Sequence, residues 1–241
     1  MNILRMTLCF FIFLCSCSAP EPQRKTLKIA TADDPQSLDP RLVRLLPDVS
    51  AVRMLFEGLI RTNSEGVNEP AAAERFSISD DKKNYTFVLR DGHWSDGSPV
   101  TARDFAETWK SVLSPSFPAP NAYQLYLIKG AKEAKEGKTS IDAVGISTPD
   151  DKTLVVELEE PSPYFIEMVA CHFYFPVHES VRNGPPVKQQ QKPIGNGPFV
   201  LDRWKPRSEV ATVKNPHYWD ADKIKTEGIS LVVLDENTAL K

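Results

Sequence analysis

The chain has 241 residues, of which 41% are hydrophobic and 25% are charged, and its formal net charge is −3. This composition is typical of globular protein, and the length allows one large domain or two smaller ones. The slightly negative charge, with no basic stripe carrying interleaved aromatic residues, argues against nucleic-acid binding. Twenty prolines against eleven glycines indicate many rigid loops and strand ends.

The N-terminal segment 6–17, MTLCFFIFLCSC, is almost wholly apolar and follows one positive residue, Arg5. It is too short to span a bilayer as a helix, but it suits the hydrophobic region of an export signal. The run Leu14-Cys15-Ser16-Cys17 resembles a bacterial lipobox, in which the final cysteine is acylated and becomes the first mature residue. We therefore expect residues 1–17 to be a signal peptide and Cys17 to carry lipid. A plain signal peptide cleaved nearby is the alternative.

Acylation of Cys17 would anchor the protein to a membrane surface without spanning it. Cys9 and Cys15 would leave with the signal, so the mature chain would keep Cys17 and Cys171. An acylated Cys17 cannot form a disulfide, so the four cysteines do not indicate a disulfide framework.

Alternation and turn residues predict the first elements of the chain. We expect a strand over 26–32, a proline-broken loop over 33–40, a helix capped by Asp48 or Ser50 with Gly58 near its C-terminus, and a turn over 63–66.

The segment 85–105, YTFVLRDGHWSDGSPVTARDF, is dense in acidic, aromatic and hydroxyl groups. Its alternation predicts a strand over 85–90 with Tyr85, Phe87 and Leu89 on one face. Asp91-Gly92 is expected to turn the chain so that 93–95 pairs back, and Asp96-Gly97 to turn it again. Thr101, with Asp104 in the capping-box position, predicts a helix over 102–114. Its buried stripe is expected to be Phe105, Trp109, Val112 and Leu113.

The remainder of the chain mixes helices and strands. We expect an amphipathic helix over 122–136, strands over 143–148 and 153–160, a short helix over 162–171 capped by Ser162, a linker over 182–194, and three strands within 197–204, 209–215 and 228–235. Strands and helices do not alternate steadily, which favours an α+β fold over a doubly wound parallel sheet.

No constellation of catalytic or metal-ligating residues stands out. The sequence lacks G-x-S-x-G, H-E-x-x-H and G-x-x-x-x-G-K-[ST] patterns. Gly195-Asn196-Gly197 precedes Pro198, which has no N–H for a phosphate, so a turn feeding the next strand is favoured over a dinucleotide loop. The acidic loop residues Asp33, Asp34 and Asp39 are interrupted by prolines, and the four histidines do not show metal-ligand spacing. We expect no catalytic residue, no metal and no cofactor.

Four blocks in order closely resemble one family, the extracytoplasmic peptide-binding lipoproteins of ABC transporters (the oligopeptide, dipeptide and nickel-binding family, solute-binding protein family 5). They are SLDP with RMLFEGLIRTNSEG, YTFVLRDGHWSDGSPVTARDFAETW, DDKTLVVELEEPSPYFIEMVA, and PIGNGPFVLDRWKPRSEVATVKNPHYWD. The resemblance covers the chain from about residue 27, and the oligopeptide-binding members look nearest.

The resemblance implies a periplasmic-binding-protein-like fold (class II, type C) with two lobes. Residues 18–56 and 179–241 would form a discontinuous and incomplete first lobe, and residues 57–178 an inserted accessory domain. Family members are about twice as long, so the second lobe would be absent from this sequence. A fragment, a frameshifted gene product and a half receptor completed by another polypeptide are three explanations that the sequence leaves open.

The resemblance also implies where ligand would bind. The peptide would lie between the lobes as an extra strand held through its backbone, so that its sequence matters little. By position, Arg44, Leu45 and Leu46 would form the strand of the first lobe that faces it, with Arg44 departing from the acidic or neutral residue common there. From the accessory domain, Asn121 or Tyr123, and Cys171 or His172, would fall near positions that line the cleft.

The function implied is capture of oligopeptides for an ABC importer, with its permease and ATPase subunits as partners. The protein would be exported and lipid-anchored on the extracytoplasmic side of the membrane, without enzymatic activity. The alternatives are a non-transporting surface lipoprotein that acts as an interaction module, a degenerate gene product, and a binder of dipeptide, nickel chelate or haem. An enzyme using Cys171 and His172 is disfavoured, because no third orienting group lies at recognisable spacing.

Overall fold

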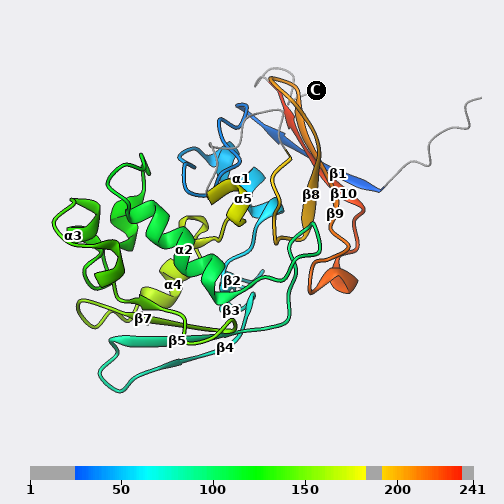
Figure 1. The fold of residues 1–241 in the computed structure, drawn as a ribbon. Helices are drawn as coiled ribbons and strands as arrows, with labels where there is room; N and C mark the ends of the chain where they lie inside the picture. The colour runs from blue at the N-terminus through cyan, green and yellow to red at the C-terminus, as the bar shows by residue number, and fades with distance from the viewer. Residues whose placement is uncertain (1–24, 183–191, 235–241) are drawn as a thin grey trace, which may run out of the picture.

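A computed structural model describes residues 25–182 and 192–234 of the chain. Helices and strands are mixed within it, and two of its sheets stand apart in Figure 1, with α1 (Leu46–Leu55) and α5 (Glu179–Arg182) between them. The α+β prediction is confirmed. The expected signal peptide, Cys17 and most of the expected linker over 182–194 lie outside the described residues. Within the described residues, no helix is both long and apolar enough to cross a membrane.

The first sheet joins the two ends of the described chain. Its strand order is β1-β10-β9-β8. β1 (Thr26–Thr31) pairs in parallel with β10 (Gly228–Val233), which runs antiparallel to β9 (Glu209–Lys214), and β9 runs antiparallel to β8 (Phe199–Lys205). Figure 1 shows the blue first strand lying beside the orange and red strands of the C-terminal part.

The second sheet is built from the middle of the chain and is wholly antiparallel, in the order β4-β5-β7-β6. Its strands are β4 (Ala73–Ile78), β5 (Asn84–Leu89), β7 (Thr153–Glu157) and β6 (Ile146–Ser147). Tyr85, Phe87 and Leu89 are buried, as their alternation predicts. A small ribbon of β2 (Ile60–Thr62) and β3 (Asn68–Pro70) surrounds the predicted turn over 63–66.

The helix α2 (Ala102–Leu113) begins and ends close to its predicted limits. The Thr101 N–H donates to the Asp104 carboxylate over 2.9 Å, as the capping box requires. The predicted stripe is buried, and the Trp109 indole N–H donates to the Tyr174 carbonyl over 2.9 Å. Beside it, the short α4 (Phe165–Val169) packs Phe165 edge-on against Tyr85.

The helix α1 (Leu46–Leu55) starts and ends earlier than predicted. Asp48 is not its N-cap but its third residue, and its carboxylate accepts the N–H of the true cap, Leu45, over 3.1 Å. Pro47 fits the first turn, where a helix needs no N–H donor.

Three other predictions were wrong in detail. Residues 93–95 do not pair back on β5, whose neighbours are β4 and β7; instead His93 bridges Pro99 in a small loop. The helix expected over 122–136 is broken into η1 (Ala122–Leu125) and α3 (Ala131–Lys135), because Gly130 between them adopts a left-handed φ of 68°. The short helix expected over 162–171 starts only at Phe165.

The remaining elements are η2 (Ile141–Ala143), η3 (His172–Tyr174), α5 (Glu179–Arg182) and η4 (Ala221–Lys223).

Candidate functional site

The segment before α1 is held by one buried carboxylate. Asp48 is 1% exposed, and its oxygens accept the backbone N–H groups of Gln36 (2.6 Å), Arg44 (3.3 Å) and Leu45 (3.1 Å). These hydrogen bonds hold the backbone at Leu45, where the chain turns into α1. The strand expected over Arg44–Leu46 is therefore not formed: residues 43–45 are irregular and Leu46 is already helical.

Two backbone groups of this segment remain open. The Arg44 carbonyl and the Leu46 N–H make no hydrogen bond to any described residue. The side chains around them are exposed, with Leu45 at 49% and Leu46 at 78%. An exposed carbonyl and N–H two residues apart can accept and donate hydrogen bonds to another extended chain.

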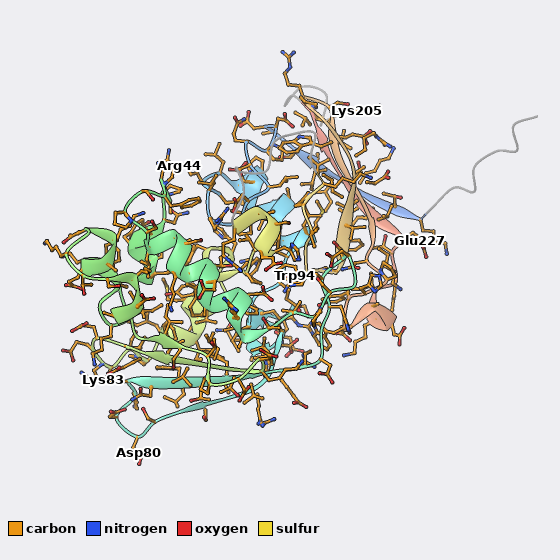
Figure 2. The ribbon with its side chains drawn as sticks, in the orientation of Figure 1. Arg44, Asp80, Lys83, Trp94, Lys205 and Glu227 are labelled. Atoms are coloured by element: carbon orange, nitrogen blue, oxygen red, sulfur yellow. The ribbon has the colours of Figure 1, made fainter. Side chains whose placement is uncertain are left out.

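The loop after α2 reaches the same segment. The Asn121 side-chain amide donates to the Val43 carbonyl over 2.8 Å, although 78 residues separate the two in sequence. Asn121 thus helps to hold the segment before α1 in place, and this hydrogen bond uses one of its two side-chain amide hydrogens. Tyr123, two residues further on, is 58% exposed. Figure 2 shows Arg44 where the blue coil before α1 meets the green loop after α2.

The C-terminal end of α1 lies next to Cys171 and His172, since η3 packs on this helix. Burial raises the pKa of the Cys171 thiol, and the positive charge of Arg53 opposes that shift. Burial and then Arg53 lower the pKa of His172, while Asp48 opposes them. The raised pKa keeps the Cys171 thiol protonated near pH 7, whereas a reactive cysteine has a lowered pKa.

Residues on and around α1 define what we name the α1 surface: Arg44, Leu45, Leu46, Arg53, Tyr123, Cys171 and His172. Cys171 and His172 are half-buried and the other five are exposed. On the helix, Leu46 and Arg53 lie two turns apart on the face opposite the buried residues Ala51, Val52 and Leu55. This definition takes in six of the seven residues expected to contact ligand and adds Arg53, while the seventh, Asn121, bonds to Val43 just before the surface. That these residues contact ligand stays a prediction.

A second cluster was not predicted as a site. Glu57 is 6% exposed, and its carboxylate accepts the Tyr218 hydroxyl and the Trp219 indole N–H, each over 2.6 Å. The Glu57 N–H donates to the Asn196 side-chain oxygen (3.0 Å), and the Asn196 amide donates back to the Glu57 carbonyl (2.9 Å). We call Glu57, Asn196, Tyr218 and Trp219 the Glu57 junction. Burial raises the pKa of Glu57, against the lowering effect of its hydrogen bonds and of Arg61 and Arg90.

The Glu57 junction fastens the segment 195–220 to the end of α1. Two glycines allow the contact: a Cβ at Gly195 would overlap the Leu55 carbonyl oxygen, and one at Gly197 would lie 2.5 Å from the Phe56 nitrogen. Arg90 stacks on the Trp219 ring at 3.7 Å from its centroid. The Gly-Asn-Gly spacing in the sequence was a signal for this close approach, and its role is packing.

The comparisons with known proteins match this geometry to one family. The family model for bacterial extracellular solute-binding proteins, family 5 (middle), matches residues 68–241. The chain belongs to this family. Among family members, the oligopeptide-binding protein OppA of Bacillus subtilis is 41% identical over 223 residues, which cover 90% of this chain and 41% of that protein. The periplasmic murein peptide-binding protein MppA of Escherichia coli is 35% identical over 214 residues, covering 86% and 39%.

Solved structures of family members agree with the fold. The unliganded open form of the murein tripeptide-binding protein MppA superposes with a TM-score of 0.83 at 33% identity, covering 90% of this chain and 43% of that one. Listeria monocytogenes OppA bound to peptide gives 0.82 at 32% identity, covering 88% and 42%. The chain thus spans about two fifths of the length of the family members it matches.

Proposed function

We propose that this chain is the peptide-capturing N-terminal part of the substrate-binding component of an ABC importer, and that it delivers oligopeptides to the permease and ATPase of that importer. The α1 surface is the proposed contact with peptide. The family membership and the names of the relatives support the ligand class, since several of them are oligopeptide- or dipeptide-binding proteins. No catalytic step is part of this function.

The observation that carries the proposal is the open backbone at the start of α1. An extended peptide can donate an N–H to the Arg44 carbonyl and accept from the Leu46 N–H, while its side chains lie over Leu45, Leu46 and Tyr123. The α1 surface extends along the helix from Leu46 to Arg53, roughly 10 Å at 1.5 Å per residue. That is the length of about three residues of extended peptide at 3.3 Å each.

We further propose that residues 18–56 and 179–241 form a discontinuous first lobe and residues 57–178 an inserted accessory domain. The pairing of β1 with β10 supports this division, because it puts both ends of the described part of the chain in one sheet, while the β4-β5-β7-β6 sheet draws its strands from 73–157 alone. The Glu57 junction lies at the first boundary. Export and a lipid anchor at Cys17 complete the proposal and rest on the sequence.

Calorimetry with the 241-residue chain and a mixture of tri- to pentapeptides tests the function. We expect peptides of unrelated sequence to bind, because the proposed hydrogen bonds are to the peptide backbone. A peptide with an N-methylated amide loses a donor, and we expect its affinity to fall by up to about tenfold, the value of one hydrogen bond. Absence of binding to any unmodified peptide would overturn the proposal that this chain captures peptide.

A paired substitution locates the contact. Tyr123→Ala removes an aromatic ring from the α1 surface and should weaken binding about fivefold, the value of roughly 1 kcal/mol of aromatic contact. The control is Tyr164→Ala, since Tyr164 is equally exposed (53% against 58%) but caps the end of α4 remote from Cys171. Equal effects of the two substitutions would show that the α1 surface is not the site.

A further inference from the structure

We infer that the α1 surface selects peptides that carry acidic side chains, through the uncompensated charges of Arg44 and Arg53. This inference rests on the proposed function and names the class of ligand for the same surface. Its basis is that Arg44 and Arg53 are exposed and that no carboxylate pairs with them among the described residues.

Both arginines are exposed and unpaired. Neither guanidinium makes an ion pair or a hydrogen bond with any described residue, whereas other arginines of the chain do: Arg41 pairs with Asp39 at 2.8 Å, and Arg203 with Glu209 at 2.8 Å. Arg53 lies close enough to act on both neighbours: its positive charge opposes the rise that burial causes in the pKa of Cys171 and, after burial, adds to the lowering of the pKa of His172.

The carboxylates near the surface do not neutralise it. Asp48 is the one acidic residue of α1, and it is buried with its oxygens occupied by the N–H groups of Gln36, Arg44 and Leu45. Glu167 is exposed one helical turn before Cys171, whose thiol donates to its backbone carbonyl over 3.5 Å. Among the described residues, neither Asp48 nor Glu167 forms an ion pair with Arg44 or Arg53. The residues that define the α1 surface therefore include two positive side chains and no acidic one.

The positions of the two arginines indicate which peptide side chains the α1 surface prefers. Arg44 precedes α1 and Arg53 lies near its end, so they flank the apolar side chains of Leu45 and Leu46. In an extended peptide the side chains of alternate residues share one face, so two glutamates separated by one residue can both point towards the arginines. A lysine in the same place would meet like charge. Exposed charge pairs contribute up to about 1 kcal/mol each, so two of them support roughly a tenfold preference for glutamate over lysine.

The test uses the 241-residue chain and three pentapeptides, Ala-Glu-Leu-Glu-Ala and its glutamine and lysine counterparts, with affinities measured by calorimetry at low ionic strength. We expect the glutamate peptide to bind about tenfold more tightly than the lysine peptide, with the glutamine peptide between them. Arg44→Gln with Arg53→Gln should bring the three within about twofold. Arg75→Gln is the matched control, since Arg75 is exposed on β4 and pairs only with its neighbour Glu74.

The outcomes separate the two proposals. If the chain binds none of the peptides, the proposed function fails and the preference with it. Equal binding of all three peptides overturns the preference and leaves peptide capture standing. A glutamate preference that survives the double substitution, or that Arg75→Gln reduces equally, also overturns the assignment to Arg44 and Arg53. Thermal unfolding of each variant confirms that it is folded, which the exposure of both arginines leads us to expect.

Discussion

Asn196→Ala removes the two-point link between the end of α1 and the C-terminal part of the chain. The Asn196 side chain accepts from the Glu57 N–H over 3.0 Å and donates to the Glu57 carbonyl over 2.9 Å, and both residues are about 5% exposed. Alanine leaves both backbone groups buried without partners. Each buried unsatisfied group costs about 1–3 kcal/mol, so we expect the free energy of unfolding to fall by about 2–6 kcal/mol.

The assay is urea denaturation followed by tryptophan fluorescence, with hydrogen exchange at the Glu57 amide as a local readout. Asn121→Ala is the comparison, because this half-buried side chain makes a single bond to the Val43 carbonyl and should cost only about 1 kcal/mol. The reasoning is refuted if Asn196→Ala costs less than Asn121→Ala, or if the Glu57 amide exchanges no faster.

Further predictions concern packing, charge and anchoring. Gly195→Ala should lose at least about 2 kcal/mol in urea denaturation, because its Cβ overlaps the Leu55 carbonyl; a loss below that of Gly92→Ala, which has open space around it, would contradict this. Asp39→Ala should cost about 3–5 kcal/mol by leaving the buried Arg41 unpaired, whereas the exposed Asp33→Ala should cost almost nothing. Because the pKa of His172 is lowered on folding, the chain should lose stability as pH falls from about 6.5 to that lowered pKa, and His172→Gln should abolish this part of the pH profile measured by thermal unfolding. Cys17→Ser should abolish incorporation of labelled fatty acid into the exported protein, and labelling that persists would refute the lipid anchor.

Local patterns predicted those elements whose signals are themselves local. The alternation of Tyr85, Phe87 and Leu89, and the capping box of Thr101 and Asp104, depend on residues a few positions apart, and both are observed. The elements that were predicted wrongly depend on contacts with residues far away in the sequence. The sequence pattern favours Asp48 as an N-cap, but in the structure it is the third residue of α1. Its carboxylate accepts the N–H of the cap residue, Leu45, and also that of Gln36, which lies twelve residues away. The hairpin expected after β5 does not form, since β7 occupies that edge of the strand.

The candidate site was placed by resemblance and not by its own chemistry. Nothing local distinguishes Arg44–Leu46 from an exposed loop, because the open Arg44 carbonyl and Leu46 N–H result from a bend imposed by Asp48. The link from Asn121 to Val43 spans 78 residues and has no local signature. The Glu57 junction escaped prediction for the same reason, since its partners are 139 to 162 residues apart.

Hydrogen exchange at the Leu46 amide tests the central claim most directly. Without ligand this N–H has no partner among the described residues and should exchange rapidly. A saturating tri- to pentapeptide should slow its exchange, while the same peptide N-methylated at each amide protects it less. Peptide binding that leaves Leu46 unprotected and protects a different segment would contradict capture at the α1 surface.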